Sequence, residues 1–195
     1  FENDTICPEI IGFTISGKNS LKIELSEEPA AEILSLTNYS LNEEKTHPVS
    51  VIRESGLVFR FVFEEVFKNK TVNYLTISGL CDKSGNCTGD TILDFTPVWA
   101  ETGDIIITEL MADPFPAVSL PAVEYLEIKN RSLFPLSLEN WRLVSVGQFT
   151  FFPDVTMQPG EIRIVTSVQD TISFKDTGKF TGLRQFPALT DEGKM

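Results

Sequence analysis

The chain has 195 residues, 42% of them hydrophobic, which is enough to form one large or two small folded domains. Its 28 acidic residues outnumber 16 basic residues, and the net charge of −12 repels phosphate backbones and anionic lipids. We therefore expect no nucleic-acid partner. The sequence has no apolar run of about 18 residues, so we also expect no membrane span.

The first hundred residues are predicted to form short β-strands, because apolar residues recur at every second position between turn-forming residues. Residues 57–63 show this most clearly, with a leucine and three phenylalanines on one face. Further strands are expected at residues 10–15, 21–25, 39–41, 49–53, 72–78 and 91–95. A helix of about two turns fits residues 29–36. This strand spacing predicts an antiparallel sandwich.

The strand pattern is interrupted at Pro97 and Gly103, and a second series begins at Ile105. We therefore predict two all-β domains, at residues 1–97 and 104–195. The strands expected in the second domain are residues 105–110, 125–129, 141–144, 149–152 and 162–166.

Four motifs of the first half occur in a recognisable order: LKIELSEEP at residues 21–29, Asn38-Tyr39, YLTISGL at residues 74–80 and DKSGN at residues 82–86. This order resembles the bacterial Ig-like domain of surface-layer and secreted proteins. The family pattern has a strand ending in F-S-E-P, a later N-Y and a closing D-x-x-G-N. This sequence departs from it in having Leu25 in place of the usual Phe and an additional Glu28.

Four motifs of the second half resemble the lamin-tail domain as it occurs in exported bacterial proteins. They are ITELMADP at 107–114, EYLEIKNRS at 124–132, LENW at 138–141 and FFPDVTMQPG at 151–160. Together the two resemblances imply an all-β chain of two tandem immunoglobulin-like β-sandwich domains.

The lamin-tail family continues with one or two more strands after the position that matches residues 189–193. We therefore predict that the second domain is truncated at its C-terminal end. A missing strand leaves a sheet edge with unpaired backbone groups. Two consequences are expected as alternatives: edge-to-edge self-association of two copies, or a poorly ordered end from about Phe180.

Cys81 and Cys87 flank the turn-forming sequence DKSGN, and four interpretations are open. A redox pair would favour a Cys-x-x-Cys spacing at a helix start, and a zinc site would have to recruit the distant Cys7 and His47. The favoured interpretation is a disulfide that closes a short loop, and reduced thiols are the alternative. Cys7 would then be unpaired or bonded to sequence that precedes Phe1.

Asp82, Asn86 and Asp90 carry oxygen atoms at a spacing that would suit calcium. A tight turn explains the same residues better, with Gly85 or Asn86 at positive φ. We therefore expect no bound cofactor or metal, with calcium at Asp82, Asn86 and Asp90 as the less favoured alternative.

The second half contains a group of carboxylates that could act as acid and base: Glu109, Asp113, Glu124 and Glu127. The resemblance places them at sheet-defining positions, with Lys129 and Arg131 as neighbouring partners, so we interpret them as structural. Trp141 is interpreted as a core residue. Asn-x-Ser/Thr sequons begin at Asn3, Asn38, Asn69, Asn86 and Asn130, and they fit a surface location.

Catalytic signals are few. His47 is the single histidine, and neither a Gly-x-Ser-x-Gly elbow nor a glycine-rich phosphate loop is present in the sequence. We therefore predict that the chain is not an enzyme but a spacer plus adhesion or docking module of a secreted or cell-surface bacterial protein. Its expected partners are other domains of the same polypeptide and protein or glycan at the cell surface. The alternative is a pair of accessory domains of an exported hydrolase or nuclease whose catalytic domain lies outside this chain.

Overall fold

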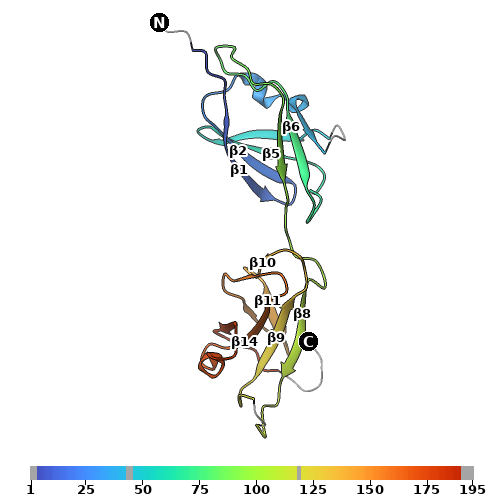
Figure 1. The fold of residues 1–195 in the computed structure, drawn as a ribbon, viewed down its shortest axis with the longest axis vertical. Helices are drawn as coiled ribbons and strands as arrows, with labels where there is room; N and C mark the ends of the chain where they lie inside the picture. Colours follow the sequence, from blue (N-terminus) through green and yellow to red (C-terminus); the bar gives the residue numbers. More distant parts are fainter. Residues whose placement is uncertain (1–3, 43–45, 118–119, 190–195) are drawn as a thin grey trace. The chain divides into compact units, whose positions relative to one another are not determined.

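A computed structural model describes residues 4–42, 46–117 and 120–189. Contacts divide the chain into two compact units, Phe1–Val98 (unit 1) and Trp99–Met195 (unit 2) (Figure 1). The described regular structure consists of strands and short 3₁₀ helices, which confirms the prediction of all-β, immunoglobulin-like sandwiches. The described part of the chain holds no helix with the length and apolarity that crossing a membrane requires.

Unit 1 contains two antiparallel sheets. The four-stranded sheet has the order β1 (Ile10–Gly17), β2 (Ser20–Leu25), β5 (Val58–Val62) and β4 (Ser50–Ser55). The three-stranded sheet has the order β3 (Tyr39–Leu41), β6 (Asn73–Ile77) and β7 (Thr91–Phe95). All seven strands lie within one or two residues of the positions that the alternating pattern predicts.

The core of unit 1 lies between these sheets, because alternate side chains of each strand point inward. Leu21, Ile23 and Leu25 of β2 are buried, as are Phe59 and Phe61 of β5. The ring of Phe61 meets that of Tyr39 on the opposite sheet edge to face, with centroids 4.6 Å apart.

Residues 29–36 were expected to form a helix of two α-turns, and this expectation is wrong in detail. The segment forms two 3₁₀ helices, η1 (Ala31–Leu34) and η2 (Leu36–Asn38). So short a segment gains too few hydrogen bonds to offset the entropy of nucleating an α-helix. Tertiary contacts fix it: Ile33 is buried, and its carbonyl accepts a hydrogen bond of 2.6 Å from the Tyr39 hydroxyl.

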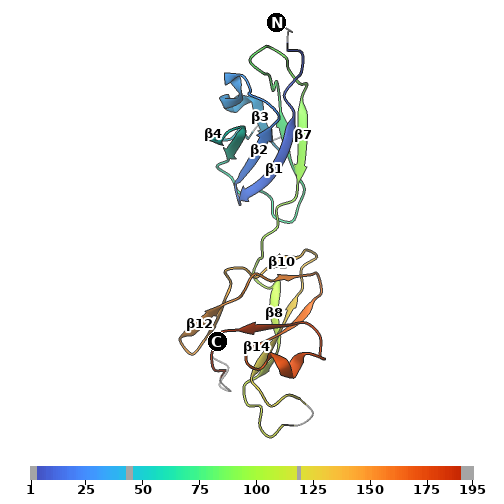
Figure 2. The same cartoon turned by 90° about the vertical axis from the view of Figure 1, so that its left-hand side faces the viewer.

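Unit 2 contains one four-stranded sheet and two two-stranded ones. The larger sheet has the order β15 (Phe180–Leu183), β14 (Ile162–Ser167), β9 (Tyr125–Asn130) and β8 (Ile105–Met111). The small sheets pair β11 (Arg142–Ser145) with β12 (Gln148–Phe151), and β10 (Leu136–Ser137) with β13 (Thr156–Met157). Figure 2 labels β8 and β14 of the large sheet, and β10 and β12 of the small ones. A 3₁₀ helix, η3 (Thr171–Phe174), precedes β15, which runs parallel to β14.

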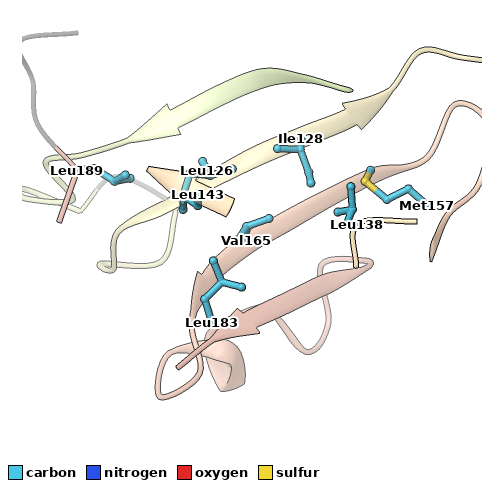
Figure 3. Close-up of a cluster of buried hydrophobic side chains, with 8 residues drawn as sticks. All are labelled: Leu126, Ile128, Leu138, Leu143, Met157, Val165, Leu183 and Leu189. Carbon is cyan, nitrogen blue, oxygen red and sulfur yellow. The ribbon is translucent and has the colours of Figure 1, made fainter. Parts of the chain in front are cut away.

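The core of unit 2 gathers side chains from all three sheets (Figure 3). The large sheet contributes Leu126 and Ile128 from β9, Val165 from β14 and Leu183 from β15. The remaining members are Leu138, Leu143, Met157 and Leu189. β9 thus supplies two residues, and β11, β13, β14 and β15 supply one each, to a shared apolar interior. This interior stabilises the unit by removing apolar surface from water.

The expectation of a poorly ordered end from about Phe180 is wrong for residues 180–189. β15 pairs with β14 and buries Thr181 and Leu183, and Leu189 belongs to the core. The Ser145 hydroxyl of β11 also donates a 2.8 Å hydrogen bond to the Ala188 carbonyl. These contacts fix the segment that follows β15 onto the end of the β11–β12 pair.

Candidate functional site

Cys81 and Cys87 form a disulfide in unit 1, with their Sγ atoms 2.02 Å apart. Cys7 is a free, half-buried thiol whose Sγ donates to the Cys87 carbonyl oxygen at 3.1 Å. His47 lies elsewhere, with its Nδ1 atom at hydrogen-bond distance from the Tyr39 carbonyl oxygen. Cys7 therefore lies beside the loop that the disulfide closes, whereas His47 contacts Tyr39 instead.

The loop closed by this disulfide is organised around the carboxylate of Asp82, which is 4% exposed. Its Oδ1 atom accepts hydrogen bonds of 2.8 Å from the backbone N–H groups of Ser84 and Asn86, and Oδ2 accepts one of 2.7 Å from Asn86 Nδ2. Burial acts to raise the pKa of Asp82, but these hydrogen bonds outweigh it and lower the pKa below its ordinary value. Gly85 takes the positive φ of 89° that the turn requires.

Two residues that the sequence analysis did not select lie beside Asp82. Carboxylate oxygens of Asp4, Glu27 and Asp82 all lie within 4.8 Å of one another. Burial, followed by the charges of Asp4 and Asp82, raises the pKa of Glu27. Asp90 is exposed and is not part of this cluster. The cluster concentrates negative charge, which a proton on Glu27 or a divalent cation would relieve.

The carboxylates of β8 and β9 bond to hydroxyl groups. Glu109 and Glu127 are opposite each other in the strand register. The Tyr125 hydroxyl donates to Glu109 and the Thr108 hydroxyl donates to Glu127, where the sequence analysis expected Lys129 and Arg131 as partners. Burial, and then the hydrogen bond to Glu109, raise the pKa of Tyr125 to about 12. Both carboxylates thus hold the β8–β9 pair together.

The other two carboxylates of this predicted group bond to backbone N–H groups. Asp113 accepts from Phe115 at 3.2 Å, and Glu124 accepts from Leu189 at 3.5 Å. The structure therefore places Glu109 and Glu127 side by side across β8 and β9, and holds Asp113 and Glu124 in separate backbone contacts.

The β11–β12 pair presents an outer face that is both aromatic and basic. Phe149 and Phe151 are 52% and 55% exposed, and their rings meet edge to face with centroids 5.6 Å apart. The guanidinium of Arg142 lies 5.5 Å from the Phe149 ring centroid, within cation–π range. Val144 lies on the same face, because it pairs with Phe149 across the two strands, and it is also exposed.

An open groove of about 1160 Å³ adjoins this face. One wall is formed by residues 147–153, which include β12, and the other by Val168 and residues 182–186, which include the end of β15. The lining contains four phenylalanines and one charged residue, Arg184. This groove is the candidate functional site of the chain, because it combines concave shape, apolar side chains and a positive charge.

Residues 100–188 match the family model of the Lamin Tail Domain. Unit 2 is a lamin tail domain. This confirms the resemblance proposed for the second half of the sequence. No curated protein matches the chain at a significant level.

Solved structures of bacterial S-layer proteins are similar to the chain. The crystal structure of the N-terminal part of the bacterial S-layer protein SbsC is 19% identical, with a TM-score of 0.41, and the match covers 74% of this chain and 37% of that one. The S-layer protein rSbsC(31–844) and domains 1–6 of surface layer protein SbsC are each 18% identical, with TM-scores of 0.43 and 0.44. Each of these two matches covers 74% of this chain and 22% of the other. The chain therefore spans much less than two thirds of the length of these proteins.

The lamin tail domain also has a buried polar residue whose role the sequence analysis missed. Asn130 is fully buried, and its Nδ2 atom donates to the carbonyls of Phe134 at 2.9 Å and Met157 at 3.0 Å. Its Oδ1 atom accepts from the Ser132 N–H at 2.9 Å. The sequence carries a signal for this role, since Asn130 continues the inward series of Leu126 and Ile128. The acceptor asparagine of the sequon that begins at Asn130 is therefore buried in the folded domain.

Trp141 lies directly before β11 in the lamin tail domain. Its side chain is half-buried and packs against the core, as the sequence analysis expected. The Trp141 carbonyl accepts a hydrogen bond of 2.9 Å from the Phe152 N–H. This bond links the residue before β11 to the residue after β12. Trp141 thus supports the wall of the groove from the core side.

Proposed function

We propose that this chain is a non-catalytic part of a secreted or cell-surface bacterial protein, in which unit 1 is a spacer and the lamin tail domain is an adhesion or docking module. The observation that carries the proposal is the exposed aromatic face of Phe149 and Phe151 beside an open groove. Large side chains exposed next to a concave surface are typical of protein interaction sites.

The disulfide between Cys81 and Cys87 supports a location outside the cytoplasm, because such bonds persist in oxidising compartments. The net charge of −12 supports a protein or glycan partner over nucleic acid. The contacts of Glu109 and Glu127 support a non-catalytic role, since each carboxylate bonds to a hydroxyl group of its own sheet.

Binding to bacterial cell envelopes tests this proposal. The labelled chain should bind envelope fractions saturably, and treating the fractions with protease should abolish the binding if the partner is a protein. Absence of saturable binding to any fraction would contradict a docking role.

A screen for hydrolysis tests the non-catalytic part of the proposal separately. The purified chain should turn over no phosphodiester, ester, glycoside or peptide substrate. Turnover that survives repurification and is lost in Glu109→Gln or Glu127→Gln would show that the chain is an enzyme.

A further inference from the structure

We propose that the groove between β12 and β15 binds an extended, acidic peptide segment of a partner protein, which adds to the lamin tail domain as a further strand. This inference rests on the docking role proposed above and specifies its surface and the chemistry of its partner. Backbone geometry, apolar exposure, charge and size each support it.

Strand edges border the groove on both sides. β15 is the edge strand of the four-stranded sheet, with β14 as its partner, and β12 pairs with β11 in a two-stranded sheet. The groove is lined by both β12 and the end of β15. A strand edge carries N–H and C=O groups that an extended peptide can pair with, and this pairing supplies affinity without depending on peptide sequence.

Phe149 and Phe151 give the groove an exposed apolar surface. These residues are two positions apart on β12, so their rings lie on the same side of the strand. Both are more than half exposed, although phenylalanine gains stability from burial. An extended segment with apolar side chains at alternate positions would cover both rings at once.

The charges around the groove favour an acidic segment. Thirteen described residues line the groove, and none of them is acidic, whereas Arg184 is exposed among them. Arg142 adds a second positive charge on the adjoining face, where its guanidinium stacks on Phe149. The chain as a whole carries a net charge of −12, so two whole copies repel each other, whereas a short acidic segment meets mainly the local positive charge.

The size of the groove favours a peptide over a small ligand. The groove has a volume of about 1160 Å³. Small-molecule pockets usually enclose about 300–1000 Å³ and surround most of the ligand surface. An open groove of this size suits a segment that lies across it.

Selection from a displayed library of random linear peptides of about ten residues tests the inference directly. The chain should enrich peptides in which Glu or Asp alternates with apolar residues, and synthetic copies should shift the backbone NMR signals of β12 and β15. A peptide with Lys in place of each acidic residue should bind at least about tenfold more weakly. The same measurements are made on three variants.

The variants are chosen to separate the groove from general surface effects. Phe149→Thr combined with Phe151→Thr should weaken binding at least about tenfold, and Arg184→Gln by about fivefold. Ile92→Thr is the matched control, because Ile92 is an exposed apolar residue of β7 in unit 1, and it should leave binding unchanged.

Several results would overturn the inference. They are the absence of any enriched peptide, enrichment without acidic residues, and binding that the double phenylalanine variant retains. A dimer in analytical ultracentrifugation that disappears in the double variant would assign the groove to a second copy instead. If the double variant still binds cell envelopes as the unchanged chain does, the docking role stands and the groove assignment is wrong.

Discussion

Glu161 and Arg163 form a partly buried ion pair in the lamin tail domain, with Glu161 Oε1 2.6 Å from Arg163 Nη2 and side chains 6% and 11% exposed. Arg163 Nη1 also donates to the Phe180 carbonyl and to the Thr181 hydroxyl, both at 3.1 Å. The pair therefore links the start of β14 to β15, the strand that forms one wall of the groove. Lys179 adds a more exposed contact to the same Glu161 carboxylate, at 2.6 Å.

Replacing Glu161 by Gln should lower the free energy of unfolding by about 2–3 kcal/mol at neutral pH, because the partly buried Arg163 guanidinium loses its counter-charge. Urea denaturation measures this change. Lys179→Met is the control: its side chain is 57% exposed, so the expected loss is under about 1 kcal/mol. Equal losses in the two variants would show that burial of the Arg163 pair adds nothing.

The same pair predicts a pH dependence. Burial acts to raise the pKa of Glu161, but hydrogen bonds from Lys179, the Gln158 N–H and Arg163 outweigh it and lower the pKa below the ordinary 4.5. The contribution of ionised Glu161 to the free energy of unfolding is therefore fully present above the ordinary carboxyl pKa. It is lost as pH falls through the lower pKa of the folded state. Urea denaturation across acidic pH should show a smaller loss for Glu161→Gln than for the unchanged chain. If the free energy of unfolding falls equally with pH in both proteins, protonation of Glu161 does not cause the loss.

Asn130→Ala should destabilise the lamin tail domain by about 3 kcal/mol, because it leaves two carbonyls and one N–H without their buried partner. Asn130→Asp keeps the shape but replaces both donors by a charge, and should be at least as costly. Arg131→Ala changes the exposed neighbouring residue and should have little effect. Thermal unfolding compares the three variants. An unchanged melting temperature for Asn130→Ala would show that the hydrogen bonds of the Asn130 side chain add no stability.

Strand periodicity was sufficient to predict most of the fold, because burial on one face imposes a period of two wherever a strand is long enough to show it. Phe59 and Phe61 of β5 are examples. β10 and β13 have two residues each, too few for a pattern. β15 has four residues, among them a glycine, and its parallel pairing with β14 is a tertiary property that local sequence does not encode.

The contacts of the carboxylates were harder to predict because they depend on register and on long-range packing. A β-bulge between Ile107 and Glu109 sets which residue of β9 faces Glu109, and no turn residue marks it. Asp4 and Glu27 reach Asp82 only through the fold of unit 1. The groove likewise joins residues 147–153 to residues 182–186, which are distant in sequence. The sequence places Phe149 and Phe151 in a strand, but it does not show that their side chains are exposed rather than buried.

The disulfide of Cys81 and Cys87 should be found intact when peptides of the unreduced protein are analysed by mass spectrometry. Full alkylation of both cysteines without reductant would contradict it. Replacing both by serine should lower the free energy of unfolding by about 2 kcal/mol, the value that loop-closure entropy gives for so short a loop. Cys7→Ser is the matched control, since Cys7 is free and half-buried, and it should cost less.

Glu27→Gln should raise the melting temperature of unit 1 at neutral pH, because it removes one of three neighbouring negative charges. The pKa of Glu27 is raised by burial and by the charges of Asp4 and Asp82, so its ionised form disfavours folding. This penalty is absent below the ordinary carboxyl pKa and develops as pH rises through the folded-state value. Melting curves should therefore converge for the variant and the unchanged chain in acid and separate at neutral pH.

Calcium chloride provides the check on this interpretation. We expect charge repulsion rather than a bound metal, so calcium should change the melting temperatures of the unchanged chain and of Glu27→Gln only by a general salt effect. Sodium chloride at equal ionic strength measures that effect. The contrary result is a calcium-specific rise in the unchanged chain that is absent in Glu27→Gln. It would show that Asp4, Glu27 and Asp82 hold a cation, because a ligand that binds the folded state stabilises it only while its site is intact.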